Sequence, residues 1–231
     1  MFGYVGESFE EVSRLYAALK LACAEDPYVK AAFKYSCHGD GWGYAIHASN
    51  GLFHYRTSRA IFSDDILLPR MEGTIHAIFH GRLATNKKLL GHIFSHPFVV
   101  GTNTQLMFLA HNGALDEEKI SLRDGQVDSE WALEQIARVG SLPAALPELR
   151  EQTKSALNLL LMTNSRNQTV PPKLEYTNFY KPPEKEKIAY YKMFLGKLAK
   201  GRAVFSSTLT LHKFAGLEVT GEAPFDKPSF L

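Results

Sequence analysis

The sequence predicts an α+β protein built on antiparallel sheets, and three observations lead to this class. Apolar segments with strand and helix patterns occur in blocks along the 231 residues, not in a regular strand–helix–strand alternation. The glycine-rich stretch 39–43 lacks the Gly-Lys-Ser/Thr ending of a phosphate-binding loop, and a strand pattern follows it where a helix would be needed. No repeat, linker or low-complexity stretch divides the chain. We therefore expect a single domain over residues 1–231.

The chain begins with a predicted strand and helix. Residues 1–5 are apolar, which is typical of a buried strand. Ser8 followed by Glu11 predicts a helix that starts with a capping box. The apolar residues behind it have helical spacing and continue this helix: Val12, Leu15, Tyr16, Leu19 and Cys23.

The middle of the chain predicts a hairpin, two further strands and two helices. Asn50-Gly51 is typical of a tight turn between strands at 44–47 and 52–55. Strands are also expected at 74–84, ending near Arg82, and at 105–111, ending at a turn formed by Asn112-Gly113. Asp128 is expected to cap a helix over 128–139, and Ser141 and Pro143 begin the next.

The second half is rich in strand-like patterns. An exposed loop is expected where the sequence is polar and contains prolines, at 164–172. Strands are expected at 156–163, 174–180, 188–195, 203–207 and 209–214.

Composition excludes several classes of function. The net charge is +2 and the Lys and Arg residues are scattered, which argues against a nucleic-acid partner. No apolar run approaches the roughly 18–20 residues of a membrane span, and the N-terminus does not resemble a signal peptide. Cys23 and Cys37 form neither a disulfide framework nor a metal-binding spacing. We expect a cytoplasmic protein without a metal or cofactor.

Polar residues gather where predicted strands end, and each has an ordinary interpretation on its own. Arg82 among apolar residues is equally consistent with a structural salt bridge and with a site that grips an anion. Asn112-Gly113 is usually a turn, although its amide groups could also donate to an oxyanion. Asp128 is most simply a helix cap, and His96 most often a hydrogen-bonded core histidine.

The order of these pieces is more informative. Class II glutamine amidotransferases, in particular the small stand-alone members, carry successive motifs that this chain resembles. The resembling segments are 38–43 (His-Gly-Asp-Gly-Trp-Gly), 80–85 (His-Gly-Arg-Leu-Ala-Thr), 95–98 (Ser-His-Pro-Phe), 110–115 (Ala-His-Asn-Gly-Ala-Leu) and 128–130 (Asp-Ser-Glu). The resemblance implies the N-terminal-nucleophile hydrolase fold, a four-layer αββα sandwich of two stacked, mainly antiparallel sheets. It also implies that an N-terminal cysteine attacks the side-chain amide of glutamine, forms a γ-glutamyl thioester and releases ammonia.

The resemblance also assigns roles to residues. Asn112 and the Gly113 N–H would form the oxyanion hole. Arg82, helped by Thr85, would hold the substrate α-carboxylate, and Asp128 the α-ammonium. His96 and His111 would brace the site, and Asp40 would shape the loop near the nucleophile.

The beginning of the sequence departs from the family pattern, which opens with Cys, two residues, and then an apolar residue and Gly. Aligning Gly3 with that glycine puts the cysteine two positions before Met1, so we expect a longer native chain that carries it. A degenerate, ligand-binding domain and a substitute nucleophile at Cys37 are the alternatives. As printed the chain has no nucleophile, and enzyme activity is expected of the longer chain.

The substrate and partners stay open at this stage. The substrate is expected to be a small molecule, either glutamine or a γ-glutamyl amide. Nothing in the sequence resembles a synthase domain that would use ammonia. Either a separate synthase subunit accepts the ammonia, or the reaction is hydrolysis of a γ-glutamyl amide of thiol or small-metabolite metabolism.

Overall fold

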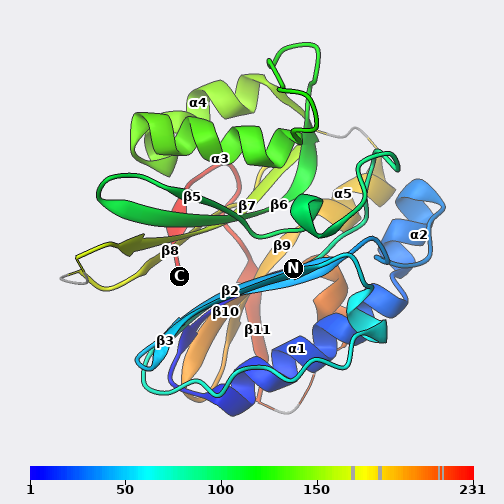
Figure 1. Ribbon diagram of the computed structural model, residues 1–231. Helices are drawn as coiled ribbons and strands as arrows, with labels where there is room; N and C mark the ends of the chain where they lie inside the picture. Colours follow the sequence, from blue (N-terminus) through cyan, green and yellow to red (C-terminus); the bar gives the residue numbers. More distant parts are fainter. Residues whose placement is uncertain (168–169, 182–183, 213, 215) are drawn as a thin grey trace.

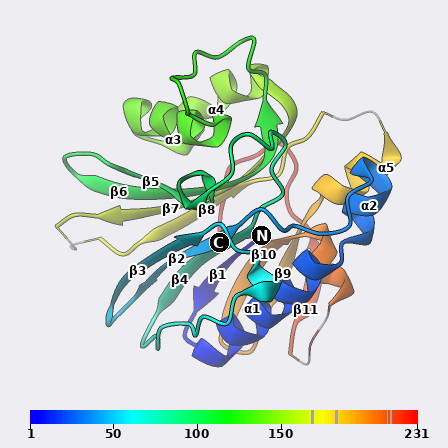
Figure 2. The ribbon, with the colours of Figure 1, turned by 45° about the vertical axis from the view of Figure 1, so that its right-hand side comes forward.

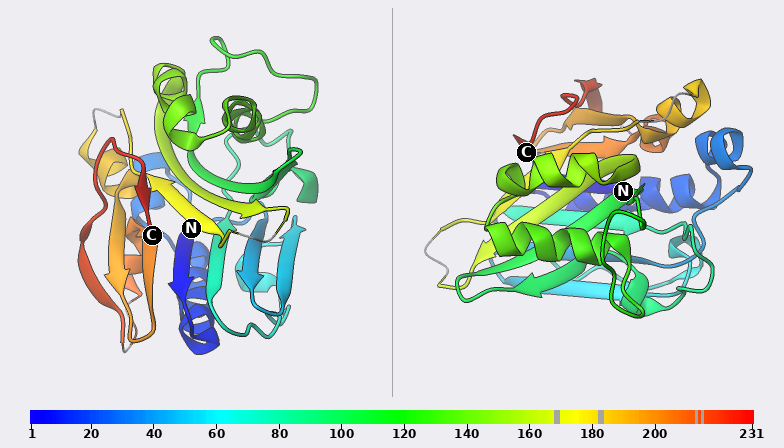
Figure 3. Two further views of the ribbon diagram at one scale, coloured as in Figure 1. Left: turned by 90° about the vertical axis from the view of Figure 1, so that its left-hand side faces the viewer. Right: turned by 90° about the horizontal axis from the view of Figure 1, so that it is seen from above.

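Two antiparallel β-sheets lie face to face, and helices cover both outer faces (Figure 1). The computed structural model describes residues 1–167, 170–181, 184–212, 214 and 216–231. The four layers, helix, sheet, sheet and helices, are seen edge-on in Figure 3. The structure therefore confirms the α+β class and the layered sandwich of two antiparallel sheets.

The seven-stranded sheet has the order β11-β9-β10-β1-β4-β2-β3, and the five-stranded sheet has the order β12-β8-β7-β6-β5. The strands of the first sheet are β1 (Phe2–Gly6), β2 (Trp42–Ala48), β3 (Gly51–Thr57), β4 (Ile75–Gly81), β9 (Met193–Lys197), β10 (Gly201–Ser206) and β11 (Glu218–Glu222). Those of the second are β5 (Phe98–Gly101), β6 (Gln105–Leu115), β7 (Thr153–Ser165), β8 (Lys173–Thr177) and β12 (Ser229–Phe230).

The helices complete the layers. Helix α1 packs on the outer face of the seven-stranded sheet, and α3 and α4 pack on the five-stranded sheet. Helices α2 and α5 lie side by side at one end of the sandwich (Figure 2). The bounds are α1 (Phe9–Ala24), α2 (Pro27–Phe33), α3 (Asp128–Val139), α4 (Leu142–Glu151) and α5 (Lys185–Tyr191), with 3₁₀ turns η1 (Ile61–Ser63), η2 (His92–Phe94) and η3 (Ser207–Leu211). None of the helices in the described part of the chain is both long and apolar enough to cross a membrane.

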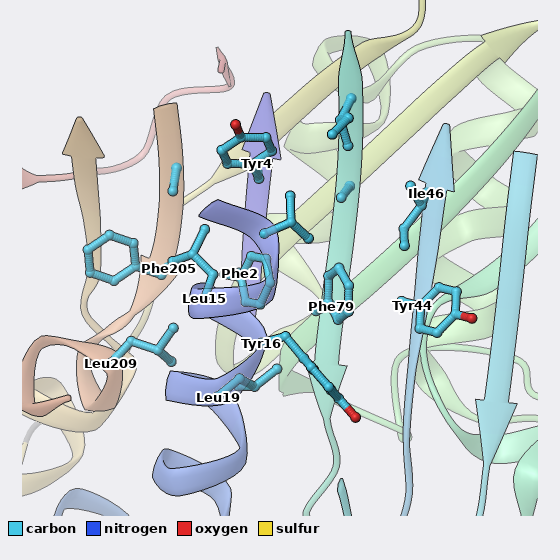
Figure 4. Close-up of a cluster of buried hydrophobic side chains, with 14 of the residues drawn as sticks. Phe2, Tyr4, Leu15, Tyr16, Leu19, Tyr44, Ile46, Phe79, Phe205 and Leu209 are labelled. Atoms are coloured by element: carbon cyan, nitrogen blue, oxygen red, sulfur yellow. The ribbon is translucent and has the colours of Figure 1, made fainter. Parts of the chain in front are cut away.

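Strand β1 lies in the interior of its sheet, between β10 and β4. Phe2 lies opposite Phe205 on one side and Phe79 on the other, and its ring stacks on that of Phe79 at 4.6 Å between centroids. Figure 4 shows these rings together with apolar side chains of α1. A strand that is covered on both faces needs apolar residues at successive positions, which explains why residues 1–5 lack polar alternation.

The predicted start of α1 is half confirmed. Ser8 caps the helix, and its hydroxyl accepts a hydrogen bond from the Glu11 N–H at 3.3 Å. The reciprocal half of the capping box is wrong, because the Glu11 carboxylate accepts from the Tyr4 hydroxyl and the Lys200 N–H instead. Glu11 therefore ties the helix to the sheet.

Two predicted strands in the second half are wrong. Residues 188–195 form the end of α5 and then β9, and 209–214 begin within the 3₁₀ turn η3. A short apolar run does not distinguish a strand from a buried helical turn. Tyr190 and Tyr191 pack edge-on against Phe33 of α2, and this tertiary contact favours the helix.

Two predicted boundaries also change. The expected turn at Asn112-Gly113 is wrong, since β6 continues to Leu115 with Asn112 opposite Asn158. The expected loop at 164–172 starts late, because Asn164 is buried inside β7. Residues 168–169 of that segment lie outside the described residues. In both cases the long β6–β7 ladder overrides local turn preferences.

Candidate functional site

A cavity of about 720 Å³ lies at the end of the sandwich where β4 and β6 stop and β1 starts. Seven of the eight residues expected to form the site line this cavity: Arg82, Thr85, His96, His111, Asn112, Gly113 and Asp128. Asp40 does not line it. The cavity lining runs from Met1 to Leu209, so segments from both ends of the described chain are brought to one place by the two sheets.

Arg82 is buried in the cavity wall and has little protein to bind. Its Nη1 donates to the Leu89 carbonyl at 3.0 Å. No carboxylate of the described residues lies within 4.0 Å of its guanidinium, although Asp40 and Asp128 are near enough to oppose the lowering of its pKa by burial. A buried guanidinium has five donors and needs an anion to offset the loss of water. The structural salt bridge considered for Arg82 is therefore absent from the described residues.

Asn112 and Gly113 are half-buried and line the cavity near the end of β6. The Tyr190 hydroxyl donates to Asn112 Oδ1 at 3.2 Å, which leaves the amide NH₂ as the donor end. Gly113 has a φ of +152°, and a Cβ there would lie 1.9 Å from the Ala156 carbonyl oxygen. Only glycine fits this close approach, so the backbone at this point is fixed by the β7 chain beside it.

Asp128 joins the start of α3 to the end of β6. Its Oδ2 accepts from the Leu115 N–H at 2.8 Å, and its Oδ1 accepts from the Ser129 N–H at 2.7 Å. It is the first residue of α3, and the N-cap is Val127, so the expected capping role is wrong. Its carboxylate instead fixes the cavity wall while remaining half-buried at its surface.

The imidazole ring of His111 has two polar contacts. Its Nε2 donates to the Ala156 carbonyl at 3.0 Å, and its Nδ1 lies 3.0 Å from the Ser129 hydroxyl. These two contacts link β6, β7 and α3 behind Gly113. The bracing role expected from the sequence stays a prediction.

His96 differs from His111 because its ring has no polar contact. Both ring nitrogens are buried without a hydrogen-bond partner among the described residues, and the ring lies 4.3 Å from that of His80. Burial lowers the pKa of both His80 and His96 well below the usual value, so both are neutral. The expected core hydrogen bonds of His96 are not found in the described chain.

Asp40 supports the cavity from behind. Its Oδ2 accepts from the Ala84 N–H at 2.8 Å and pairs with Lys87, while its own N–H donates to the Arg82 carbonyl at 3.0 Å. It thereby shapes the loop that follows β4 and carries Thr85, which is exposed at the cavity mouth.

Several cavity residues were not predicted. Asp26 precedes α2, and its carboxylate binds His38 and Thr208. Asp26 was not predicted from the sequence, and Thr208 lies beside the strand expected at 209–214, which does not form. The other unpredicted residues with polar groups at the cavity include Cys23, His80, Lys154, Tyr190 and Ser206.

The α-amine of Met1 also reaches the cavity. It donates to the Ser206 hydroxyl at 3.0 Å and is buried. Burial lowers its pKa below the usual 8.0, and the nearby Cys23 and Asp26 side chains partly oppose this. The deep end of the cavity is therefore where the start of β1 meets β10.

Searches for similar proteins give little at the level of sequence. No family model matches the chain, and no curated protein does. Among solved structures, a predicted glutamine amidotransferase from Pseudomonas aeruginosa PA01 is similar, at 18% identity over 83% of this chain and 81% of that chain, with a TM-score of 0.40. At this identity and TM-score, function has to be argued from the site. Nor do any three His, Cys, Asp or Glu residues come together as metal ligands in the described ranges.

Proposed function

We propose that this chain is a glutamine amidotransferase-type domain that cleaves the side-chain amide of glutamine or of a γ-glutamyl compound. The observation that carries the proposal is Arg82, a buried guanidinium that faces the cavity and has no carboxylate partner among the described residues. A substrate α-carboxylate would supply the missing anion in a bidentate pair. The half-buried Asp128 carboxylate on the same cavity would receive the substrate α-ammonium, with Thr85 at the mouth.

The chemistry would take place beside Asn112 and Gly113. In the proposed role, the Asn112 amide and the Gly113 N–H donate to the oxyanion that forms on the side-chain carbonyl. The hydrogen bond from Tyr190 fixes the direction of the Asn112 amide. The close approach of the Ala156 carbonyl, which leaves no room for a Cβ, fixes the backbone at Gly113. Such donors act best when they are held before the charge develops, which these contacts achieve.

The proposed nucleophile is a cysteine two residues before Met1, and the strand register supports this position. Phe2 lies opposite Phe205 and Phe79, so each step upstream on β1 corresponds to one step downstream on β10 and β4. The paired strands end at Ser206 and Gly81, and Thr208 of η3 and Arg82, which follow them closely, line the cavity into which two added residues would extend. Alternation puts that side chain on the same face as Met1, between the two sheets.

The proposed reaction proceeds in two steps. The free α-amine takes the thiol proton, and the thiolate attacks the amide carbon. The C–N bond then breaks, the α-ammonium returns its proton to the departing ammonia, and a γ-glutamyl thioester remains. Water, deprotonated by the α-amine, hydrolyses the thioester and frees the thiol.

The two cysteines of the described chain fit this role less well. Cys37 does not line the cavity. Cys23 does, but burial raises the pKa of its thiol to about 12, so it stays protonated. Neither carries a free α-amine.

A γ-glutamyl amide larger than glutamine is a second candidate, and the size of the cavity favours it. A volume of about 720 Å³ is in the range of pockets that hold ligands considerably larger than one amino acid. Both lysines and carboxylates surround its mouth, namely Lys87, Lys88, Lys154, Asp116, Glu117 and Glu118. In that case hydrolysis would be the complete reaction, whereas with glutamine a separate ammonia-accepting subunit in the cytoplasm is the corresponding proposal.

The test compares three chains: the chain as printed, one preceded by Cys-Arg, and one preceded by Ala-Arg. We expect glutamate and ammonia release from glutamine or γ-glutamyl amides only with Cys-Arg, and loss of that activity on thiol alkylation. The N-terminal mass of the protein from its natural host checks the native start. If the Cys-Arg chain binds γ-glutamyl compounds in calorimetry but hydrolyses none of them, the degenerate binding domain is favoured instead.

A further inference from the structure

A cluster of three side chains lies at the deep end of the cavity, and the roles above do not use it. Asp26 precedes α2, His38 precedes β2, and Thr208 lies in η3. His38 Nε2 and Thr208 Oγ1 both contact Asp26 Oδ2 at 2.8 Å. The other oxygen, Oδ1, accepts from the Tyr28 and Val29 N–H groups and caps α2. All three side chains line the cavity.

Asp26 is a buried carboxylate at 1% exposure. Burial alone would raise its pKa, but the contacts with His38 and Thr208 and the Val29 N–H outweigh this, and the pKa is lowered. Its only ion-pair partner within 4.0 Å in the described chain is His38, which is charged only when protonated. Asp26 therefore carries a negative charge on the cavity wall, and no Lys or Arg of the described residues lies within 4.0 Å of its carboxylate.

The hydroxyl of Thr208 has a fixed direction. Because it donates its single hydrogen to Asp26, it can only accept from any group in the cavity. Two residues earlier, Ser206 already accepts from an α-amine, that of Met1, at 3.0 Å. Thr208 follows in η3 and lines the same cavity, into which the amine of the proposed nucleophile would extend.

We propose that Asp26, His38 and Thr208 form a positioning group for the α-amine of the nucleophilic residue. Thr208 accepts a hydrogen bond from that amine, Asp26 orients Thr208 and supplies negative charge for the ammonium formed by proton transfer, and His38 holds Asp26. The proposal rests on the proposed function. Its consequence is that the amine is held in line with the thiol, and that its pKa is raised relative to an amine without this group.

Other titratable and charged groups face the same place, so single variants are needed. They are Cys23 from α1, His80 and Arg82 from the end of β4, and Tyr190 from α5. Each stays unchanged in the experiment. A change in the pKa of the α-amine that is seen only in variants of the cluster is then caused by the cluster.

The first test measures the amine directly and does not depend on turnover. In the Ala-Arg chain with a ¹³Cα-labelled first residue, the α-amine titration is followed by NMR in the parent and in Asp26→Asn. The asparagine oxygen can still cap α2, which preserves the local fold. We expect a lower amine pKa in Asp26→Asn and in Thr208→Val, and a parent-like pKa in Thr208→Ser.

The second test uses the Cys-Arg chain. Asp26→Asn and Thr208→Val should lower kcat by about 10²-fold, in the range of positioned proton transfer, with little change in KM. The acid limb of the kcat/KM profile, where the amine must be neutral, should move to lower pH. A purely structural role would lower the plateau without moving that limb.

Asp64→Asn is the matched control. Asp64 is a buried carboxylate that also accepts from two side chains, Trp42 Nε1 at 2.9 Å and the Tyr55 hydroxyl at 2.8 Å, but it does not line the cavity. It should leave the amine pKa and the acid limb in place. An unchanged amine pKa in both Asp26→Asn and Thr208→Val would overturn the inference, whether or not the Cys-Arg chain is active. Inactivity of the parent Cys-Arg chain together with shifted amine pKa values would overturn only the proposed function.

Discussion

The two ends of strand β1 bury polar groups in opposite ways. At the Gly6 end, the Glu11 carboxylate accepts from the Tyr4 hydroxyl at 2.9 Å and from the Lys200 N–H at 2.8 Å. At the Met1 end, the five N–H donors of the Arg82 guanidinium have one acceptor among the described residues, the Leu89 carbonyl. Both ring nitrogens of His96 have no hydrogen-bond partner there. The first end is satisfied by the protein itself, and the second is not.

This difference separates structure from function within a single element. A buried polar group without a partner costs free energy, so it persists where a ligand completes it. Glu11 joins α1 to the sheet and needs nothing further. Arg82 needs an anion that the described chain does not provide. Changes at the two ends should therefore affect different properties.

The largest effect is expected at the cavity end, in Arg82→Lys of the Cys-Arg chain. Loss of a desolvated bidentate pair should weaken substrate binding by about 2–5 kcal/mol, because an ammonium cannot reproduce the planar fork. Calorimetry and KM measure this effect, while the midpoint of urea unfolding should change little.

Arg56→Lys is the control for this prediction. Arg56 also donates to main-chain carbonyls, those of Ile93 and Ser95 at 3.1 and 3.3 Å, but it lies outside the cavity. If Arg56→Lys lost as much substrate affinity as Arg82→Lys, the loss would not be specific to the cavity at the Met1 end of β1.

An intermediate effect is expected at the satisfied end, in Glu11→Gln. An amide has one accepting oxygen, so one of the two donors loses its partner at a cost of about 1–3 kcal/mol of stability. Urea unfolding should show the loss, with the kinetics of the Cys-Arg chain unchanged. Glu10→Gln on the exposed side of α1 should cost less than about 0.5 kcal/mol. A loss of turnover in Glu11→Gln would contradict the purely structural role.

The smallest effect concerns pH. His76 on β4 lies opposite His47, and burial followed by the charge of His47 lowers its pKa from 6.5 to about 4. The unfolded chain therefore takes up a proton between pH 6.5 and 4 that the folded chain refuses. The contribution of His76 to the free energy of unfolding is complete above pH 6.5 and is lost as the pH drops through this window. The loss is at most about 2 kcal/mol at pH 5.

Urea unfolding at pH 7 and pH 5 checks this prediction by comparing the parent with His76→Gln. The variant should lose less stability on acidification than the parent. His80 and His96 have the same sign of effect, so some pH dependence remains in both chains. An identical loss in the two chains would mean that His76 titrates normally.

The sequence identified candidate site residues where they belong to short motifs along the chain. Arg82, Asn112 and Asp128 each lie at the end or start of an element, and their motifs could be found without coordinates. Asp26 and Thr208 could not be found in this way, because their contact joins residues 182 positions apart. Tyr190 was placed in a strand because its short apolar run fits both periods, and only its packing on Phe33 decides for the helix.

The central place of β1 has a consequence for the order of events during synthesis. Strand β1 is synthesised long before its partner β10, because Ser206 lies 205 residues after Met1. At about 5–20 residues per second, this partner arrives roughly 10–40 s after the N-terminus. During that interval the edge of β1 that pairs with β10 stays uncovered, and afterwards the finished sheet encloses the strand.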